Sequence, residues 1–504
     1  MIRRSLRAPV RPGWPLLAQG AALGVLAALG QAPWSLWPVA LAGFGGLVWL
    51  YSRTTRTGHA AWLGWAGGAG YFALSLFWII EPFLVDIPRH GWMAPFALLF
   101  LAGGLALIWA LAFGVARHLG GLWALVALWS AAEMLRAVLF TGFPWASIGH
   151  IWADYPMAQL ASLGGTPLLT FLTLLISAGP SLQQRVIGTG LSVLVLAAAW
   201  GYGALVLGGN LATDTGKTVR LIQPNAPQHQ KWDADMIPVF LQRAIDLTAA
   251  SAPVQPDVII WPETSIAYPL DASPNTLAGI AQAGGGVPII VGGNDRVDGN
   301  WHNTMLLLNP DGSRGATYYK HHIVPFGEYI PFGELLAHWG IRGLASRDGA
   351  GFAPGPGPAL IELPGIGTAL PLICYELIFP RNLRGLATRP DLILQITNDA
   401  WFGEVSGPYQ HLAQARLRAI EQGLPLVRAA NTGVSAVIDP WGRIMAQTLL
   451  GEAAYLDAKL SAPAAATLYA GIGDWPMRGL LMLLLIWQIA ARRRNRVDVS
   501  GAQG

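Results

Sequence analysis

The chain has 504 residues, of which 53% are hydrophobic and 12% are charged, and its formal net charge is +4. Soluble domains carry about 25% charged residues, so this composition excludes a disordered chain and argues against a wholly soluble protein. The basic residues are scattered, which gives no indication of a nucleic-acid partner. Residues 1–210 hold only ten arginines and four acidic residues, which predicts a membrane part followed by a globular part.

The first 210 residues contain long apolar runs. A helix needs about 20 apolar residues to cross the hydrocarbon core of a membrane. We therefore predict a membrane domain over 1–210 with seven transmembrane helices, a C-terminal transmembrane helix at 470–490 and a tail at 491–504. The seven runs before residue 210 lie at about 14–30, 34–51, 61–84, 92–115, 121–140, 161–179 and 187–208.

Arginines in the short loops predict how these helices are oriented. The N-terminus and the second, fourth and sixth loops carry arginines, whereas the odd loops offer only Arg89. Since positively charged loops stay in the cytoplasm, both termini are expected inside and the segment after the seventh run outside. The first run also resembles a signal peptide with a small-residue site at 28–30, but an uncleaved helix fits a multi-spanning chain better, and cleavage would not change the sidedness.

Some polar and aromatic residues of the membrane part invite two interpretations. Glu81, Glu133 and Arg136 lie in or near apolar runs, where charges are functional candidates, although structural pairing or an interfacial role is equally open near the ends of spans. The aromatic loop 141–150 is expected outside. It is expected either to dip into the interface and touch a lipid or to form an interfacial belt.

Residues 217–461 have a different character, with short β-like runs between turn residues and helical stretches. Strands that alternate with helices predict one α/β domain of about 245 residues. The helical stretches are expected at 235–251, 275–284 and 408–422, the last as an amphipathic cover. The strands are expected at 219–223, 258–261, 288–292, 305–308, 370–374, 392–396 and 434–438.

Three polar residues stand at the ends of apolar runs in this domain. They are Glu263 in Trp-Pro-Glu, Lys320 in Tyr-Tyr-Lys-His-His, and Cys374 in Ile-Cys-Tyr-Glu. A carboxylate beside a thiol can take its proton, and an ammonium favours the thiolate and a later oxyanion. Cys374 is the only cysteine, which excludes an internal disulfide. From spacing alone, a small buried core residue is the alternative interpretation of Cys374.

These segments resemble the Glu-Lys-Cys signature of the nitrilase, or carbon–nitrogen hydrolase, superfamily, over about residues 217–461. The Pro-Phe-Gly-Glu328 and Thr-Asn398-Asp-Ala-Trp401-Phe-Gly segments match in the same order. The resemblance implies a four-layer αββα sandwich in which Glu263 is the general base, Cys374 the nucleophile and Lys320 the cation that stabilises the oxyanion. A fold class follows: a polytopic α-helical bundle of about eight spans carrying an extracytoplasmic nitrilase-like domain.

With its predicted spans, the whole chain is similar to membrane-embedded acyltransferases of that superfamily. The resemblance implies a bacterial inner-membrane enzyme that moves an acyl chain from a phospholipid to Cys374 and then to the α-amine of a diacylglyceryl-cysteine apolipoprotein. It implies no metal or organic cofactor. One alternative is a membrane-tethered amidase with water as acceptor. Another is a transporter or receptor in which Cys374 is dispensable and intramembrane charges line a path.

The resemblance also implies roles for residues around the three catalytic candidates. Alternation along a strand that continues past Cys374 would place Glu376 on the same side as Cys374 and Tyr375 on the other. His321 and His322 lack metal-ligand spacing, so structural roles are expected. The Pro- and Gly-rich segments 325–333 and 350–358 are lid candidates. The supporting or substrate-binding candidates are Glu328, Tyr375, Glu376, Trp232, Trp401 and Asn398.

Overall fold

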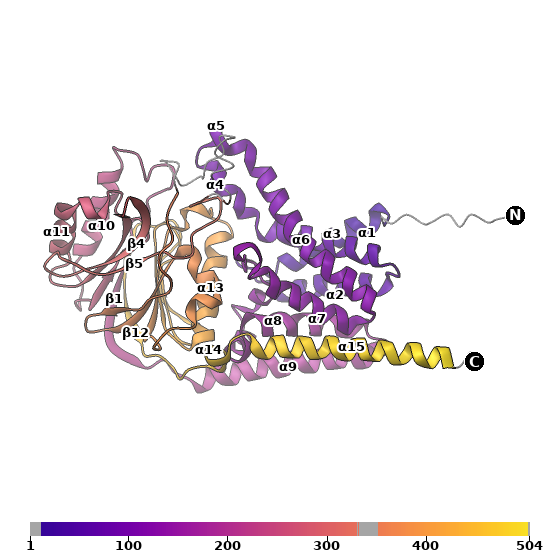
Figure 1. The fold of residues 1–504 in the computed structure, drawn as a ribbon. Helices are drawn as coiled ribbons and strands as arrows, with labels where there is room; N and C mark the ends of the chain where they lie inside the picture. Colours follow the sequence, from indigo (N-terminus) through magenta and orange to yellow (C-terminus); the bar gives the residue numbers. More distant parts are fainter. Residues whose placement is uncertain (1–11, 330, 332–350, 502–504) are drawn as a thin grey trace. The chain divides into compact units, whose positions relative to one another are not determined.

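The computed structural model describes residues 12–329, 331 and 351–501 (Figure 1). Its contacts divide the chain into two compact units. The helical unit comprises Met1–Ile80, Trp92–Gly209 and Gly471–Gly504, and the sheet unit comprises Glu81–Gly91 and Asn210–Ala470. The arginines that precede residue 12 lie outside the described residues, as do residues 330, 332 and 333 of one lid candidate, 325–333, and residue 350, the first of the other.

The sheet unit is built on two six-stranded sheets of similar topology. The strand orders are β12-β1-β2-β3-β4-β5 and β11-β10-β9-β8-β7-β6, and the three strands β1–β3 and β7–β9 of each sheet pair in parallel. The first sheet comprises β1 (Asp214–Gln223), β2 (Val258–Ile260), β3 (Ile289–Val297), β4 (Asn300–Leu308), β5 (Arg314–Tyr319) and β12 (Ala454–Ser461). The second comprises β6 (Ile361–Leu363), β7 (Gly367–Ile373), β8 (Leu392–Thr397), β9 (Leu426–Ala430), β10 (Ala436–Ile438) and β11 (Ile444–Gln447).

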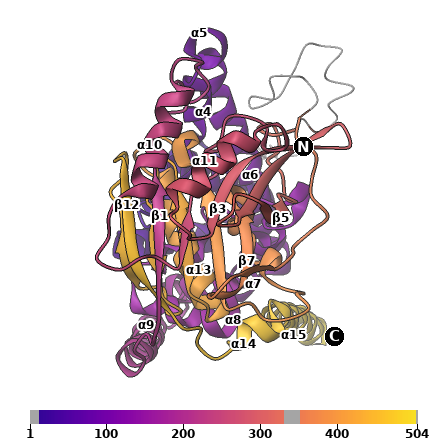
Figure 2. The same cartoon turned by 90° about the vertical axis from the view of Figure 1, so that its left-hand side faces the viewer.

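Helices cover the outer faces of the two sheets (Figures 1 and 2). Side chains of α10 (Ile237–Ala249) and α11 (Pro274–Ala283) share an apolar core with β1–β4, and α13 (Gly407–Gln422) shares a second core with β7–β10. The order helix, sheet, sheet, helix agrees with the αββα sandwich that the resemblance implied. Helix α13 covers the sheet as predicted, but the expected amphipathic character was wrong, because its charged residues Arg418 and Glu421 are buried and pair with each other at 2.8 Å.

The helical unit has a helix at each of the eight predicted apolar runs. The third run is broken near its end, where Thr57–Ser75 and Phe77–Leu84 meet at a bend of 66°. The eight helices are α1 (Trp14–Ala28), α2 (Trp37–Arg53), α3 (Thr57–Ser75), α6 (Ala94–Leu119), α7 (Leu122–Arg136), α8 (Ala161–Ala178), α9 (Arg185–Gly209) and α15 (Trp475–Gly501).

Fewer helices than predicted meet the length and hydropathy expected of a span. Within the described part of the chain three stretches qualify, Ile87–Leu119, Pro156–Ser181 and Arg185–Gly209, or four if the bent pair counts as one span. Helices α1 and α7 have 15 residues and α2 has 17, fewer than the ~20 that cover the hydrocarbon core. The eight spans therefore stay a prediction.

A buried ion pair lies in the core of the helical unit. The guanidinium of Arg136 donates to the Glu133 carboxylate at 2.6 Å and to the Trp145 carbonyl at 2.8 Å, and Trp109 Nε1 donates to Glu133 at 2.9 Å. Both charged residues are less than 5% exposed. The structure thus gives these two charges a structural pairing, one of the interpretations that the sequence left open.

The aromatic loop 141–150 folds inward from Pro144 onward. Residues 144–152 are buried, and the Tyr71 hydroxyl donates to the Ala146 carbonyl at 3.0 Å while Gln31 Nε2 donates to the Ser147 carbonyl at 3.0 Å. Both interpretations from the sequence, lipid contact and an interfacial belt, were wrong for this part of the loop. The reason is that Arg136, Tyr71 and Gln31 offer partners for its carbonyl groups inside the helical unit, so the backbone is satisfied there.

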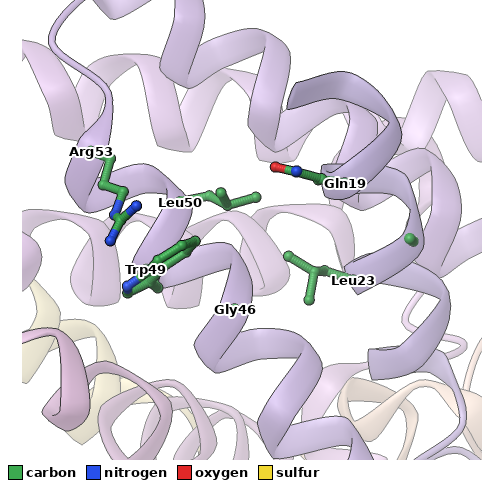
Figure 3. A pocket seen from close by; sticks show the side chains of 7 residues that line it. Gln19, Leu23, Gly46, Trp49, Leu50 and Arg53 are labelled. Atoms are coloured by element: carbon green, nitrogen blue, oxygen red, sulfur yellow. The ribbon is translucent and has the colours of Figure 1, made fainter. Parts of the chain in front are cut away.

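A pocket of about 720 Å³ opens between α1 and α2 of the helical unit (Figure 3). Gly46 lies against Leu23, where an added Cβ would come within 2.5 Å of a Leu23 methyl and would require this side chain to shift. The Arg53 guanidinium stacks over the Trp49 ring at 3.6 Å. The pocket contains none of the residues that the sequence singled out for catalysis.

Candidate active site

The three catalytic candidates follow the ends of three strands in the sheet unit. Glu263 follows β2, Lys320 follows β5, and Cys374 follows β7. Lys320 Nζ lies 3.6 Å from Glu263 Oε1, and the charges of both residues act on the Cys374 thiol. The three residues are 6%, 1% and 5% exposed, respectively. The structure therefore brings together residues that are 57 and 54 positions apart in the sequence.

Neutral donors fix the Glu263 carboxylate. Asn303 Nδ2 donates to Oε1 at 2.7 Å, and the backbone N–H of Asn398 donates to Oε2 at 2.8 Å. Gly292 of β3 lies against this turn, where a Cβ would come within 2.4 Å of the Pro262 carbonyl and 2.7 Å of Glu263 Cα. A side chain at position 292 would therefore displace Glu263. The carboxylate is thus oriented by two uncharged donors.

Lys320 is held chiefly by Glu328. Its Nζ donates to Glu328 Oε1 at 2.8 Å, and the second oxygen of Glu328 accepts the Val324 N–H at 2.8 Å. Burial alone would lower the pKa of Lys320, but the carboxylates of Glu328 and Glu263 outweigh burial and raise the pKa above its ordinary value. Lys320 is thus an ammonium at neutral pH. The placement of Glu328 agrees with its predicted supporting role, although the role itself stays a prediction.

Cys374 stands where β7 turns into a short 3₁₀ helix, Cys374–Ile378, and its φ is +50°. A non-glycine residue in this left-handed region costs about 1–3 kcal/mol, and such strain often occurs at active sites. Burial, and next the negative charge of Glu263, raise the pKa of the thiol, while Lys320 acts in the opposite direction. The resting thiol is therefore protonated, and nucleophilic attack needs a base to take its proton.

Glu376 connects the segment after β5 to the turn after β7. Its carboxylate accepts the backbone N–H groups of His321 at 2.8 Å, His322 at 3.1 Å and Ile373 at 2.8 Å, and the Tyr318 hydroxyl at 2.9 Å. Burial would raise the pKa of Glu376, but the hydrogen bond and charge of the His321 ring, then the Ile373 N–H and the Lys320 charge, lower it below its ordinary value. The predicted alternation past Cys374 was wrong, because the strand ends at Ile373 and the backbone curls into the 3₁₀ turn.

A buried polar network lies beneath Cys374, and the sequence interpretation missed it. The Asp399 carboxylate pairs with Arg428, accepts the Thr397 hydroxyl at 2.8 Å and contacts His411 Nδ1 at 3.0 Å. Although burial opposes ionisation, the Arg428 charge lowers the pKa of Asp399 to about 2. Thr397 also hydrogen-bonds the Cys374 side chain. The only sequence signal was the position of Asp399 in the motif after β8.

The remaining candidates differ in how closely they approach the three central residues. Asn398 belongs to the site: besides its backbone bond to Glu263, its side chain donates to Gln228 at 2.8 Å. Tyr375 follows Cys374 in the sequence and is buried. Its ring packs edge to face against Phe379, with 4.9 Å between the ring centroids. The half-buried Trp232 and Trp401 lie on turns near the site in the sequence, and their predicted contact with acyl chains stays a prediction.

The histidines after Lys320 have structural partners. The His321 ring lies 2.7 Å from the Glu376 carboxylate, and the His322 ring stacks on Phe379 with a centroid distance of 3.8 Å. Burial, and next the nearby Arg381 charge, lower the pKa of His322 to about 4, so it is neutral at physiological pH. In the part of the chain that the structure describes, no group of three or more His, Cys, Asp or Glu side chains is arranged to hold a metal ion.

Two facing sheets with a cysteine, a lysine and a glutamate at strand ends define a domain of the carbon–nitrogen hydrolase class. The carbon–nitrogen hydrolase family model matches residues 218–468, and the model of the apolipoprotein N-acyltransferase N-terminal domain matches residues 23–179. An amidase from Nesterenkonia sp. is similar at 22% identity with a TM-score of 0.35, covering 50% of this chain and 94% of the amidase.

Curated relatives match almost the whole chain. Apolipoprotein N-acyltransferase of Rhodopseudomonas palustris is 37% identical, covering 95% of this chain and 96% of the relative. The proteins of the same name from Bradyrhizobium diazoefficiens and Caulobacter vibrioides are 38% and 37% identical and cover 96% and 94% of this chain, and 96% and 93% of the relatives. The chain belongs to the apolipoprotein N-acyltransferase family.

Proposed function

We propose that this protein transfers a fatty acyl chain from a phospholipid, through a thioester on Cys374, to the N-terminal α-amine of a diacylglyceryl-cysteine apolipoprotein, and so completes lipoprotein maturation. Family membership supports the acyltransferase activity and its two substrates. One observation carries the thioester step: the chain's only cysteine is buried, strained and coupled to the charges of Glu263 and Lys320.

In the first half of the reaction, Glu263 takes the thiol proton and Cys374 Sγ attacks the ester carbonyl of the phospholipid. Lys320 faces the negative charge that develops on the carbonyl oxygen, where a fixed ammonium in a buried site acts most strongly. The S–C bond forms and the ester C–O bond breaks. The lysophospholipid leaves as an alcohol, with the proton returned by Glu263.

In the second half, the α-amine of the acceptor attacks the thioester carbonyl. Glu263 accepts a proton from the attacking nitrogen, Lys320 again stabilises the oxyanion, and Cys374 leaves as the thiol when the proton is passed back. The product is an amide, and the enzyme returns to its starting state. Both halves use the same three groups, which gives a ping-pong order in which the first product leaves before the acceptor reacts.

The supporting residues have roles that follow from their contacts. Glu328 holds Lys320 and so positions the oxyanion cation. Asn398 holds the Glu263 carboxylate through its backbone. Glu376 fixes the two loops that carry Lys320 and Cys374. The half-buried Trp232 and Trp401 and the buried Tyr375 are proposed to contact the acyl chains.

The protein is proposed to be a multi-pass protein of the bacterial inner membrane. The proposal includes about eight spans, both termini in the cytoplasm and the catalytic domain on the periplasmic side, as the distribution of arginines predicts. Its domains are the membrane domain 1–210, the catalytic domain 217–461, the last transmembrane helix 470–490 and the cytoplasmic tail 491–504. The three to four helical stretches with the length and hydropathy of a span support membrane insertion.

The test is intact-protein mass spectrometry of the detergent-purified protein after incubation with phosphatidylethanolamine and no acceptor. A mass gain of one acyl chain in the wild type that is absent in Cys374→Ala is expected. Addition of a diacylglyceryl-cysteine peptide then removes the adduct and yields the N-acylated peptide. A folded wild-type protein that forms no adduct refutes the lipid-donor assignment, and loss of the adduct to water alone, with no acylated peptide, indicates a hydrolase.

A further inference from the structure

A second buried ammonium lies at the candidate site. Lys231 is one of only four lysines in the chain and is 5% exposed. Its Nζ donates to the backbone carbonyl of Glu263 at 3.2 Å and to the Thr264 hydroxyl at 2.9 Å. The two groups whose charges act on it are Glu263 and Cys374, the proposed base and nucleophile.

The charges around the base do not balance without Lys231. Lys320 is 2.8 Å from Glu328 but 3.6 Å from Glu263, so its positive charge is largely matched by Glu328. The nearest other partners of the Glu263 carboxylate are the neutral side chain of Asn303 and a backbone N–H. A buried carboxylate without a matching cation is strongly disfavoured. Lys231 contacts the Glu263 backbone carbonyl and not the carboxylate, but its charge acts on Glu263 and makes the four-residue set electrically neutral.

The other charged groups near the thiol are already matched. Asp399, whose negative charge acts on Cys374, pairs with Arg428 and contacts His411. Glu376 contacts the His321 ring. The cations near Asp399 and Glu376 are therefore already paired with those carboxylates. Among the residues that the structure describes, only Lys231 and Lys320 remain to balance the negative charge of Glu263.

The surrounding contacts hold Lys231 in place. The Lys231 N–H donates to the Pro227 carbonyl at 2.9 Å, and the neighbouring Gln228 accepts from the Asn398 side chain. Thr264, which Lys231 contacts, has a φ of +45°, a conformation that needs support from its neighbours. One amine therefore both stabilises the strained turn that carries Glu263 and places its charge beside the base.

We propose that Lys231 is a positioning residue that keeps Glu263 ionised, so that the proposed thioester chemistry uses two carboxylates and two ammonium groups. The proposal rests on the proposed function, because it concerns the base of that reaction. Burial, offset in part by Glu263 and Cys374, lowers the pKa of Lys231 to about 8, so the amine is still mostly charged at neutral pH.

The test is the rate at which iodoacetamide alkylates Cys374 in the full-length protein in detergent, from pH 5 to pH 9, followed by intact mass. In this reaction the S–C bond forms, iodide leaves and Glu263 receives the thiol proton, so only molecules with ionised Glu263 react through the base. Because no lipid is involved, the result is independent of whether a phospholipid is the acyl donor. Failure of lipid to acylate Cys374 would refute the proposed function and leave this profile unchanged.

Three variants separate the charge of Lys231 from its hydrogen bonds. Lys231→Gln keeps a hydrogen-bond donor but removes the charge. We expect the acidic limb of its profile, the pH below which its Cys374 alkylation rate falls, to rise by about one pH unit, which is a tenfold change in the proton affinity of Glu263. Lys231→Arg keeps the charge and is expected to keep the wild-type limb. Lys217→Met, which removes a partly exposed lysine paired with Asp257, is the matched control and is expected to behave as wild type.

A wild-type profile in a folded Lys231→Gln protein would overturn the proposal. Folding is checked by thermal unfolding followed through tryptophan fluorescence. If Lys231→Gln melts far below the wild type, Lys231→Arg provides the test instead. A shift of about one pH unit in the acidic limb of its alkylation profile, although the positive charge is kept, would also overturn the proposal. Acyl-enzyme formation from phosphatidylethanolamine is expected to show the same shift in Lys231→Gln, which a purely structural role would not produce.

Discussion

Replacement of Glu376 by glutamine tests whether this carboxylate holds the two loops that carry Lys320 and Cys374. If the amide oxygen takes the place of Oε1, the amide NH₂ group faces the Ile373 N–H, which then loses its acceptor. A buried orphan donor costs about 1–3 kcal/mol, and each hydrogen bond that loses its charged acceptor weakens by about 1 kcal/mol. With three such bonds, from Tyr318, His321 and His322, the expected loss is about 4–6 kcal/mol.

The single buried cysteine provides an assay that reports on the sheet unit alone. Because Cys374 is buried, a thiol-reactive dye labels it faster once heating opens its surroundings. For a domain of this size a loss of 1 kcal/mol lowers the Tm by about 2–4 °C, so Glu376→Gln is expected to melt about 8–24 °C below wild type. The exposed Glu452→Gln serves as the matched control. A Glu376→Gln protein that melts within about 2 °C of wild type would refute the idea that Glu376 holds the two loops together.

Three further outcomes follow from the strained, charged and paired residues. Cys374→Gly and Cys374→Ala are both expected to lose the acyl adduct. The glycine variant is expected to melt about 1–4 °C above the alanine variant, because glycine adopts the left-handed φ without the cost of a Cβ. A higher Tm for the alanine variant would contradict the backbone strain at position 374. The pKa of Asp399 is about 2 in the fold against 3.8 unfolded, so this group contributes about 2 kcal/mol of stability above pH 3.8 that is lost as the pH falls toward 2. Asp399→Asn should therefore lower stability at pH 7 and flatten acid unfolding, and an unchanged acid transition would speak against the pairing with Arg428. Arg136→Met should lower the free energy of unfolding by about 3–5 kcal/mol, because it leaves Glu133 buried and unpaired. Adding Glu133→Gln to this variant should restore much of the lost stability. An equally unstable double variant would mean that the packing of Arg136, and not its charge, stabilises the fold.

The sequence predicted the elements that are long or wholly apolar. Helices appear at all eight apolar runs, and the seven expected strands correspond to observed strands, because continuous burial leaves a continuous apolar run. The strands that were missed include β11, which alternates between partly buried and exposed positions, and β12, whose first half is partly buried or exposed. Strand β9, which contains the buried Arg428, was also missed. Edge strands and strands with buried polar residues lack the apolar signal that the prediction used.

The candidate site was predictable where a motif marks it and not where contacts build it. Glu263, Lys320 and Cys374 could be named because they interrupt apolar runs within a family signature, and the structure brings them together. Lys231 and Asp399 could not, because the partners that give them importance are distant in the sequence: Glu263 lies 32 positions from Lys231, and Arg428 lies 29 positions from Asp399. The direction of the Glu376 side chain was also beyond prediction, because it depends on where the strand ends.

The pairing of β1 with β12 bears on how the gene could be cut and rejoined. Asp214 near the start of the sheet unit's main segment and Ser461 near its end are partners on adjacent antiparallel strands, so their Cα atoms lie about 5 Å apart. The two ends of the segment Asp214–Ser461 thus lie side by side within the sheet unit. Its excision would leave two ends that a few glycines could span, and cyclising or permuting it at this seam would strain neither sheet.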